Sequence, residues 1–287
     1  MSKARKRQLA RRYERRLAER RARQRRRRVA IAAGSIVGAT LLVVAFLTFV
    51  AGGGEPAPSP SPTSGTGPTG PTGAEPGTRT GTVTPSPGPT EVACGAAVPA
   101  GADRPKPQFA APAQVLEAGK RYTATLRTSC GDIVIELLSE DAPETVNSFV
   151  FLARRGFFDG TRFHRIDASL DVIQGGDPTG TGSGGPGYTI PDELTGDERY
   201  GPGVVAMANA GPDTGGSQFF IVAGPGGHQL DARPAYTIFG RVVRGMDVVR
   251  RIARLPIQDP EAAAAGDLRG QQPAQAVYLE AVIVRAR

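Results

Sequence analysis

The sequence contains no tryptophan, and its 287 residues include only two histidines, two cysteines and three methionines. Zinc and most transition metals are held by clusters of Cys, His and carboxylate side chains. His164, His228 and two widely separated cysteines form no such cluster, so we expect no metal site. The Gly-rich stretch 175–187 lacks the Gly-Lys-Ser/Thr ending of a phosphate-binding loop, and we therefore expect no cofactor.

Acidic charge is nearly absent from the N-terminal end of the chain. Residues 1–28 hold fifteen Lys and Arg against two Glu, a net charge of +13, so the formal charge of +8 leaves −5 for the rest. The high pI therefore describes this basic segment, and we expect no nucleic-acid partner. Nucleic-acid binding by these arginines is the alternative interpretation.

A run of twenty-three residues without charge, Val29 to Ala51, follows the basic segment. It is long enough to cross a hydrocarbon core of roughly 30 Å as a transmembrane helix. Because the basic residues lie only before it, the positive-inside tendency predicts a single-pass cell-membrane protein with residues 1–28 in the cytoplasm and all later residues outside it. The run exceeds the apolar region of about 7 to 15 residues that is typical of a cleaved signal peptide, which is the alternative.

Residues 52–93 are almost only Gly, Pro, Ser and Thr. Such a stretch cannot bury enough apolar surface to fold, so we expect a disordered linker there. A segment at 94–121 then leads into the folded domain. Outside the cytoplasm, Cys94 and Cys130 are expected to form a disulfide that pins this segment to the domain, and two unpaired thiols are the alternative.

The second half of the chain alternates apolar and polar residues in short runs, which predicts strands. We expect strands at 122–128, 132–138, 161–166, 172–174, 204–208, 218–222, 237–243 and 276–284. Helical patterns follow Asp141, with Pro143 in the first turn, and cover Met246 to Leu255. Short strands with Gly-rich connections predict a mainly β fold over 122–287, a closed antiparallel β-barrel capped by two α-helices.

Five motifs occur along this region. They are Phe163-His164-Arg165-Ile166, Gln174-Gly175-Gly176-Asp177, Met207-Ala208-Asn209-Ala210-Gly211-Pro212, Gly216-Ser217-Gln218-Phe219-Phe220-Ile221 and Phe239-Gly240. In order and spacing they resemble the cyclophilin family of peptidyl-prolyl cis/trans isomerases, from about Tyr122 to the C-terminus. With its basic segment and apolar run, the whole layout looks like the membrane-anchored envelope cyclophilins of GC-rich Gram-positive bacteria.

The resemblance implies a cyclophilin-like barrel that accelerates X-Pro rotation in secreted or envelope proteins, with X-Pro polypeptides as partners. We expect a monomer. An X-Pro bond rotates slowly because amide resonance sets a barrier of about 18 to 20 kcal/mol. Acceleration needs an apolar pocket for the ring and a donor aimed at charge that appears when the amide twists. Arginine suits the donor role because it stays protonated and presents a fixed fork.

The resemblance also assigns roles to individual residues. Arg165 is implied as the catalytic donor, with Gln174 as its catalytic support. The residues implied to bind substrate are Phe163, His164, Val172, Ala208, Asn209, Ala210, Gln218, Phe220, Leu230 and Tyr236. Strand alternation predicts that Phe219 faces the core while Phe220 faces the groove.

The sequence departs from the family pattern at several positions. The interval from Arg165 to Gln174 is one residue longer than usual, and Leu170 or Asp171 stands where a pocket phenylalanine is common. Gln229 occupies the place of the tryptophan of cyclosporin-binding members, and Tyr236 that of a histidine. The alternatives to an enzyme are a noncatalytic module that binds Pro-containing peptides and an envelope scaffold in which the Arg-rich segment is the working part.

Overall fold

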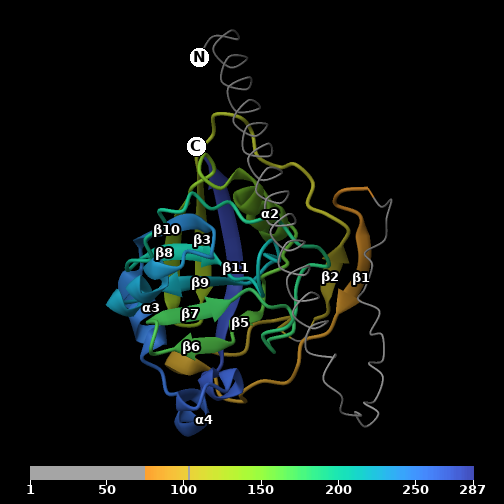
Figure 1. The fold of residues 1–287 in the computed structure, drawn as a ribbon. Helices are drawn as coiled ribbons and strands as arrows, with labels where there is room; N and C mark the ends of the chain where they lie inside the picture. Colours follow the sequence, from red (N-terminus) through yellow and green to blue (C-terminus); the bar gives the residue numbers. More distant parts are fainter. Residues whose placement is uncertain (1–74, 103) are drawn as a thin grey trace, which may run out of the picture. The chain divides into compact units, whose positions relative to one another are not determined.

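The computed structural model describes residues 75–102 and 104–287, which belong to one compact unit (Figure 1). Its centre is a nine-stranded antiparallel sheet in the order β5-β11-β3-β4-β10-β8-β9-β7-β6. The strands are β3 (Tyr122–Thr128), β4 (Gly131–Leu137), β5 (Thr161–Phe163), β6 (Arg165–Asp167), β7 (Val172–Gly175), β8 (Val204–Met207), β9 (Phe219–Val222), β10 (Ile238–Arg244) and β11 (Val277–Ala286). Every strand expected from alternation in 122–287 is present, with bounds shifted by two residues or fewer in most cases.

The sheet is nearly closed into a barrel. Its two end strands, β5 and β6, are consecutive in the chain and are separated only by His164. β5 pairs with β11, β6 pairs with β7, and an isolated bridge joins Arg162 to Asp177 just beyond β7. The expectation of a mainly β, antiparallel barrel is therefore confirmed.

Both expected helices are present. α2 (Pro143–Arg154) begins at a proline, as a first helical turn tolerates, and α3 (Met246–Ala253) packs on β4 and β7. α2 is not capped by Asp141, because Ala142 is its N-cap; the Glu193 carboxylate instead accepts from the amides of Glu144 (3.2 Å) and Thr145 (2.9 Å). The remaining short elements are α4 (Pro260–Ala264), η1 (Ala93–Gly95), η2 (Pro225–Ala232) and η3 (Leu268–Gln271).

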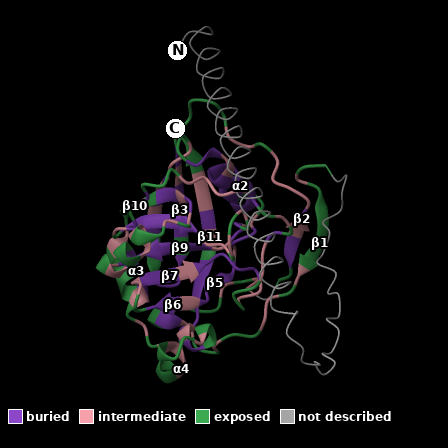
Figure 2. Cartoon of the chain, viewed as in Figure 1, coloured by how far each residue is buried: buried purple, intermediate pink, exposed green. Residues whose placement is uncertain are grey.

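Aromatic rings fill much of the barrel interior. Phe149 of α2 lies with its ring centroid 5.0 Å from that of Phe158, 5.7 Å from Phe219 and 5.3 Å from Phe239. All four rings are buried, in agreement with the purple interior in Figure 2. Burial of rings of this size supplies a large share of the hydrophobic stabilisation of the barrel.

The predicted linker of residues 52–93 is wrong in its last part. Arg79–Val83 forms β1, which pairs antiparallel with β2 (Lys106–Phe109). Farther along, the Ser86 amide donates to the Thr179 carbonyl at 2.8 Å, and Val92 bridges to Ala276. The physical reason is that Arg-Thr-Gly-Thr-Val contains β-favouring residues whose partner, Phe109, is buried on the domain, so this strand is stabilised by docking rather than by its own composition.

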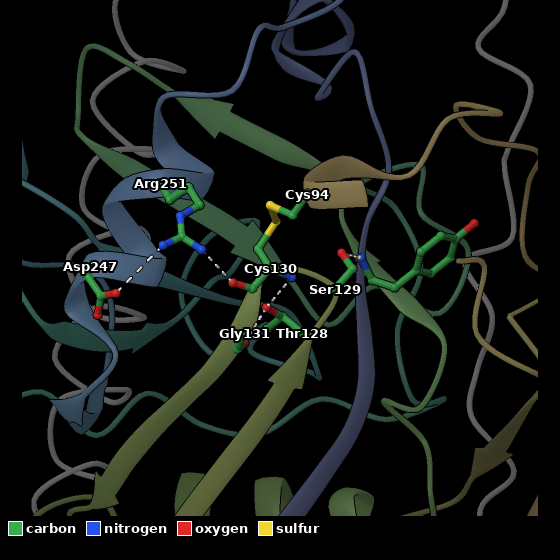
Figure 3. The surroundings of a disulfide bond; sticks show 8 residues. Cys94, Thr128, Ser129, Cys130, Gly131, Asp247 and Arg251 are labelled. Carbon is green, nitrogen blue, oxygen red and sulfur yellow. Dashed lines mark hydrogen bonds and ion pairs between the residues drawn. A yellow bond between two sulfur atoms is a disulfide. The ribbon is translucent and has the colours of Figure 1, made fainter. Parts of the chain in front are cut away.

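Cys94 and Cys130, the pair expected from the sequence, form a disulfide with an S–S distance of 2.04 Å and a Cα–Cα distance of 5.3 Å. Figure 3 shows the bridge between the η1 turn and the β3–β4 connection. Arg251 of α3 donates from Nη1 to the Cys130 carbonyl at 3.2 Å. The segment before the barrel is thus attached to it covalently, by the bridge of Val92 to Ala276 and by the hydrogen bond of Ser86 to Thr179.

No helix within residues 75–102 and 104–287 is long and apolar enough to cross a bilayer. The predicted basic segment 1–28, the predicted transmembrane helix Val29 to Ala51, and the linker up to residue 74 lie outside the described residues.

Candidate active site

Strand pairing brings Arg165 and Gln174 together. The register of β6 and β7 places the two residues directly opposite each other, and Arg165 Nη1 donates to Gln174 Oε1 at 2.9 Å. Adjacent residues on a strand face opposite ways, so Ile166 enters the core while Arg165 stays half-buried on the other face. The side chains implied as catalytic donor and support are therefore in direct contact.

The Arg165 guanidinium has two further partners. Nη2 forms an ion pair with Asp167 Oδ2 at 2.5 Å, and Nε donates to Gln271 Oε1 of η3 at 2.5 Å. Neither residue was predicted from the sequence. Strand periodicity gives a signal for Asp167, which lies two positions after Arg165, but no pattern points to Gln271, 106 positions away.

Glutamine side chains extend this network from Gln174. Its Nε2 donates to Gln218 Oε1 at 3.0 Å, and Gln218 Nε2 donates to the carbonyls of Gly182 and Gly184, each at 2.9 Å. Gly176 is required nearby because its φ is +82° and a Cβ there would lie 2.3 Å from the Ser217 carbonyl oxygen. The network fixes Gln174 and Gln218, both predicted site residues, side by side.

An apolar cluster separate from the barrel core lies beside this network. Its buried members include Val172 and Phe220, and it is completed by partly buried Leu230, Tyr236 and Ala208. All five were predicted to bind substrate. The cluster also contains Tyr200, Val204, Ala206 and Val222, with Leu170 and Ile238 packed against it.

The two adjacent phenylalanines of β9 occupy different clusters. Phe219 belongs to the barrel core, whereas the Phe220 ring packs edge-to-face on Tyr236, with centroids 5.3 Å apart. Leu170, rather than Asp171, joins the cluster of Phe220. Asp171 adopts φ of +51° and accepts from the Gly226 amide at 2.8 Å, so its carboxylate holds η2 in place instead.

Asn209 follows β8 as a half-buried residue. Its side-chain amide donates to the Ala235 carbonyl at 2.7 Å, while the flanking amides of Ala208 and Ala210 donate to Gln218 O and Thr214 Oγ1. Within the described part of the chain, the main-chain N–H and C=O of Asn209 make no hydrogen bond. This fixed residue therefore offers both backbone groups to an extended peptide.

Two residues predicted to bind substrate lie elsewhere. Phe163 is a core residue, 1% exposed, because the strand expected over 161–166 breaks at His164 and resets the alternation. The His164 ring is also buried, facing a small cavity of about 10 Å³ that Pro89, Gly180 and Pro273 help to line. Both ring nitrogens lack a partner among the described residues, and burial lowers the pKa of His164, so the imidazole is neutral.

Asp167 carries a charge beside Arg165. Burial raises the pKa of Asp167, but hydrogen bonds from Ser169 and Leu170 and the charge of Arg165 outweigh that effect, so this pKa lies below its ordinary value. The Asp167 carboxylate is therefore ionised at neutral pH. Within the described residues, no three His, Cys, Asp or Glu side chains are placed to hold a metal ion.

These features define a class of protein. An antiparallel barrel that presents an apolar cluster, the backbone groups of Asn209 and an oriented guanidinium is suited to bind an extended peptide and to stabilise charge that develops on its backbone.

The comparisons identify the family. The family model described as cyclophilin type peptidyl-prolyl cis-trans isomerase/CLD matches residues 123–280. The chain belongs to this family and is a peptidyl-prolyl cis-trans isomerase of the cyclophilin type, and members bind proline-containing peptides as substrates.

Individual relatives and a solved structure support the same family assignment. Human peptidyl-prolyl cis-trans isomerase-like 1 is 52% identical over 131 residues, which cover 44% of this chain and 76% of the relative. Isomerase CYP18-2 of Arabidopsis thaliana is 46% identical over 138 residues, covering 47% and 82%. A cyclophilin-type isomerase of Cryptosporidium parvum, solved also in the presence of the dipeptide Ala-Pro, has a TM-score of 0.50 and 28% identity, covering 58% of this chain and 99% of that one. These relatives are eukaryotic, so the likeness to bacterial envelope cyclophilins stays a prediction.

Proposed function

We propose that this enzyme is held at the cell membrane by Val29 to Ala51, works outside the cytoplasm on X-Pro bonds of secreted or envelope proteins, and uses Arg165 to stabilise the twisted amide. The observation that carries the mechanism is the contact of Arg165 with Gln174 next to the apolar cluster of Phe220. A proline ring in that cluster would bring its imide to the guanidinium.

The chemistry follows from what rotation does to the amide. When the C–N bond twists, resonance is lost and the nitrogen regains a lone pair. A permanently charged donor fixed beside that nitrogen interacts more strongly with the twisted state than with either planar isomer, so it lowers the barrier. The ring-binding cluster and the backbone of Asn209 act on planar and twisted states alike and contribute mainly to affinity.

The location rests on two features of the chain. The charge-free run Val29 to Ala51, with fifteen basic residues before it, is typical of a single-pass anchor whose N-terminus stays in the cytoplasm. The Cys94–Cys130 disulfide supports the same assignment, because such bonds persist mainly in oxidising compartments. A foldase for exported chains would work in that compartment.

The test of the mechanism is Arg165→Ala in a protease-coupled isomerase assay. Removal of one preorganised donor typically costs about 2.7 to 4 kcal/mol, so kcat/KM should fall roughly a hundredfold to a thousandfold while peptide affinity changes much less. Arg241→Ala removes an exposed arginine of β10 and serves as the matched control. A folded Arg165→Ala protein within about threefold of parental kcat/KM would overturn the mechanism.

A further inference from the structure

We propose that Asp167 and Gln271 are positioning residues for Arg165, which fix the direction of its guanidinium before substrate arrives and so raise kcat without adding to substrate affinity. The inference rests on the proposed role of Arg165. It is independent of where in the cell the enzyme works.

The strand geometry puts Asp167 where it can act. Residues at i and i+2 of a strand share a face, so Asp167 projects on the same side of β6 as Arg165. Asp167 is only 4% exposed, and its Oδ2 lies 2.5 Å from Arg165 Nη2. An exposed pair would be screened and loosely held, whereas burial on the carboxylate side keeps this pair defined.

Asp167 is itself immobilised by the turn that follows β6. Its second oxygen, Oδ1, accepts from the Ser169 amide at 2.9 Å, the Ser169 hydroxyl at 2.6 Å and the Leu170 amide at 3.1 Å. The two carboxylate oxygens therefore have separate tasks. Oδ1 holds the Asp167 carboxylate to the following turn, and Oδ2 holds the Arg165 guanidinium to that carboxylate.

Gln271 holds the Nε end of the guanidinium from a loop that is closed on itself. The Gln258 amide donates to Gln272 O at 2.8 Å, Asp259 N to Gly270 O at 3.2 Å, and Ala274 N to Pro256 O at 2.8 Å. Gly270 is tightly enclosed, since a Cβ there would lie 2.5 Å from the Asp259 carbonyl oxygen. The loop thus presents the Gln271 amide at a fixed place beside β6.

Three of the five N–H donors of Arg165 have partners within the described residues. A guanidinium has five N–H groups, and one each on Nε, Nη1 and Nη2 is engaged by Gln271, Gln174 and Asp167. Within the described residues, this leaves one N–H on Nη1 and one on Nη2. A planar group held at three points cannot rotate, so the two remaining donors keep one direction and need no reorganisation when the amide twists.

The experiment compares variants of the full-length chain, purified in detergent, by kcat and KM for an X-Pro peptide. Asp167→Asn retains an acceptor for the turn but turns an amide donor toward Nη2, so the guanidinium loses its anchor. Because misplacement of a catalytic group can cost up to about a hundredfold, we expect kcat to fall about tenfold with KM within about twofold. Gln271→Ala removes a neutral partner and should lower kcat by about threefold.

Two controls separate positioning from a structural effect. Arg269→Ala removes an exposed ion pair with Asp267 in the same η3 turn as Gln271 but touches neither Arg165 nor Asp167, and its kcat should stay within about twofold of the parent. Arg165→Ala combined with Asp167→Asn should be no slower than Arg165→Ala alone, because Asp167 acts only through the arginine. Gln271→Ala lies outside the turn that follows β6 and tests the proposal even if Asp167→Asn does not fold.

The outcomes are distinguishable. If Arg165→Ala keeps nearly full activity, the proposed catalytic role of Arg165 fails, and the positioning role fails with it. If Arg165→Ala loses activity while Asp167→Asn and Gln271→Ala both keep kcat within twofold, only the positioning role fails. An equal loss in Arg269→Ala, or a further loss in the double variant, would also overturn the positioning role.

Discussion

Phe219 and Phe220 are adjacent in sequence but serve different purposes, which makes them a matched pair for substitution. Phe220→Ala should weaken peptide binding and raise KM more than it lowers kcat, because the ring cluster holds planar and twisted states alike. Phe219→Ala should instead lower the free energy of unfolding by about 3 to 5 kcal/mol, because it opens a cavity among the core rings.

Peptide titration beside urea unfolding of both variants checks this prediction. The result that contradicts it is a Phe220→Ala protein with parental affinity, or a Phe219→Ala protein as stable as the parent.

For single residues, the sequence predicted the role correctly where that role follows from the neighbouring residues in the sequence. Alternation separated Phe219 from Phe220, and motif resemblance paired Arg165 with Gln174. It failed for Phe163, because the break at His164 resets the alternation of the strand. It could not find Gln271, whose contact with Arg165 depends on the tertiary fold alone.

Among the elements, the start of α2 depends on a carboxylate from another part of the chain. Burial raises the pKa of Glu193 to about 7, and the amides of Thr145 and Glu144 oppose this shift only in part. The ordinary pKa is 4.5, which we take for the unfolded chain. Between these values the folded protein holds a proton that the unfolded chain has lost, so stability falls as pH rises from about 4.5 to 7.

The Glu193→Gln variant tests this dependence. Glutamine cannot ionise, so the free energy of unfolding of the variant relative to the parent should increase by about 3 kcal/mol between pH 4.5 and pH 8. Urea denaturation of both proteins at three pH values gives this difference and cancels other titrating groups. A difference that stays constant with pH, or shifts in favour of the parent at high pH, would contradict the assignment.

The disulfide joins two elements that are 36 residues apart in sequence. In the chain-entropy model, a closed loop of this size contributes about 3 to 4 kcal/mol to stability. Replacement of both cysteines by alanine should lower the unfolding free energy by about that amount, as measured by urea denaturation. The reduced parent should match the double variant, and an oxidised parent no more stable than either would refute the claim.

The elements also show where composition misleads. Strands of the barrel were predictable because their alternation reflects burial in the domain. β1 was not, because Arg79–Val83 lies within a Pro-, Gly- and Thr-rich stretch and its pairing partner is fixed by tertiary contacts. The predicted linker boundary at residue 93 was therefore placed too late.

For the whole molecule, the charge asymmetry around Val29 to Ala51 predicts topology. A reporter that is active only after export, fused after residue 240, should be active, whereas a cytoplasmic reporter at the same position should not. Deleting the arginines of residues 1–28 should weaken this preference. Strong cytoplasmic signal from the parental fusion would show that the proposed location is wrong.

The attachment of the N-terminal segment has a mechanical consequence. If the barrel is tethered through its N-terminus and grips a client, tension enters the described chain at residue 75. This tension would first break the pairing of β1 with β2 and then the hydrogen bond from the Ser86 amide to the Thr179 carbonyl. At Cys94 the load passes through the disulfide to Cys130, so residues 95–129, including all of β3, lie outside the force path. The disulfide therefore prevents unfolding that starts at the tethered end from extending into the barrel.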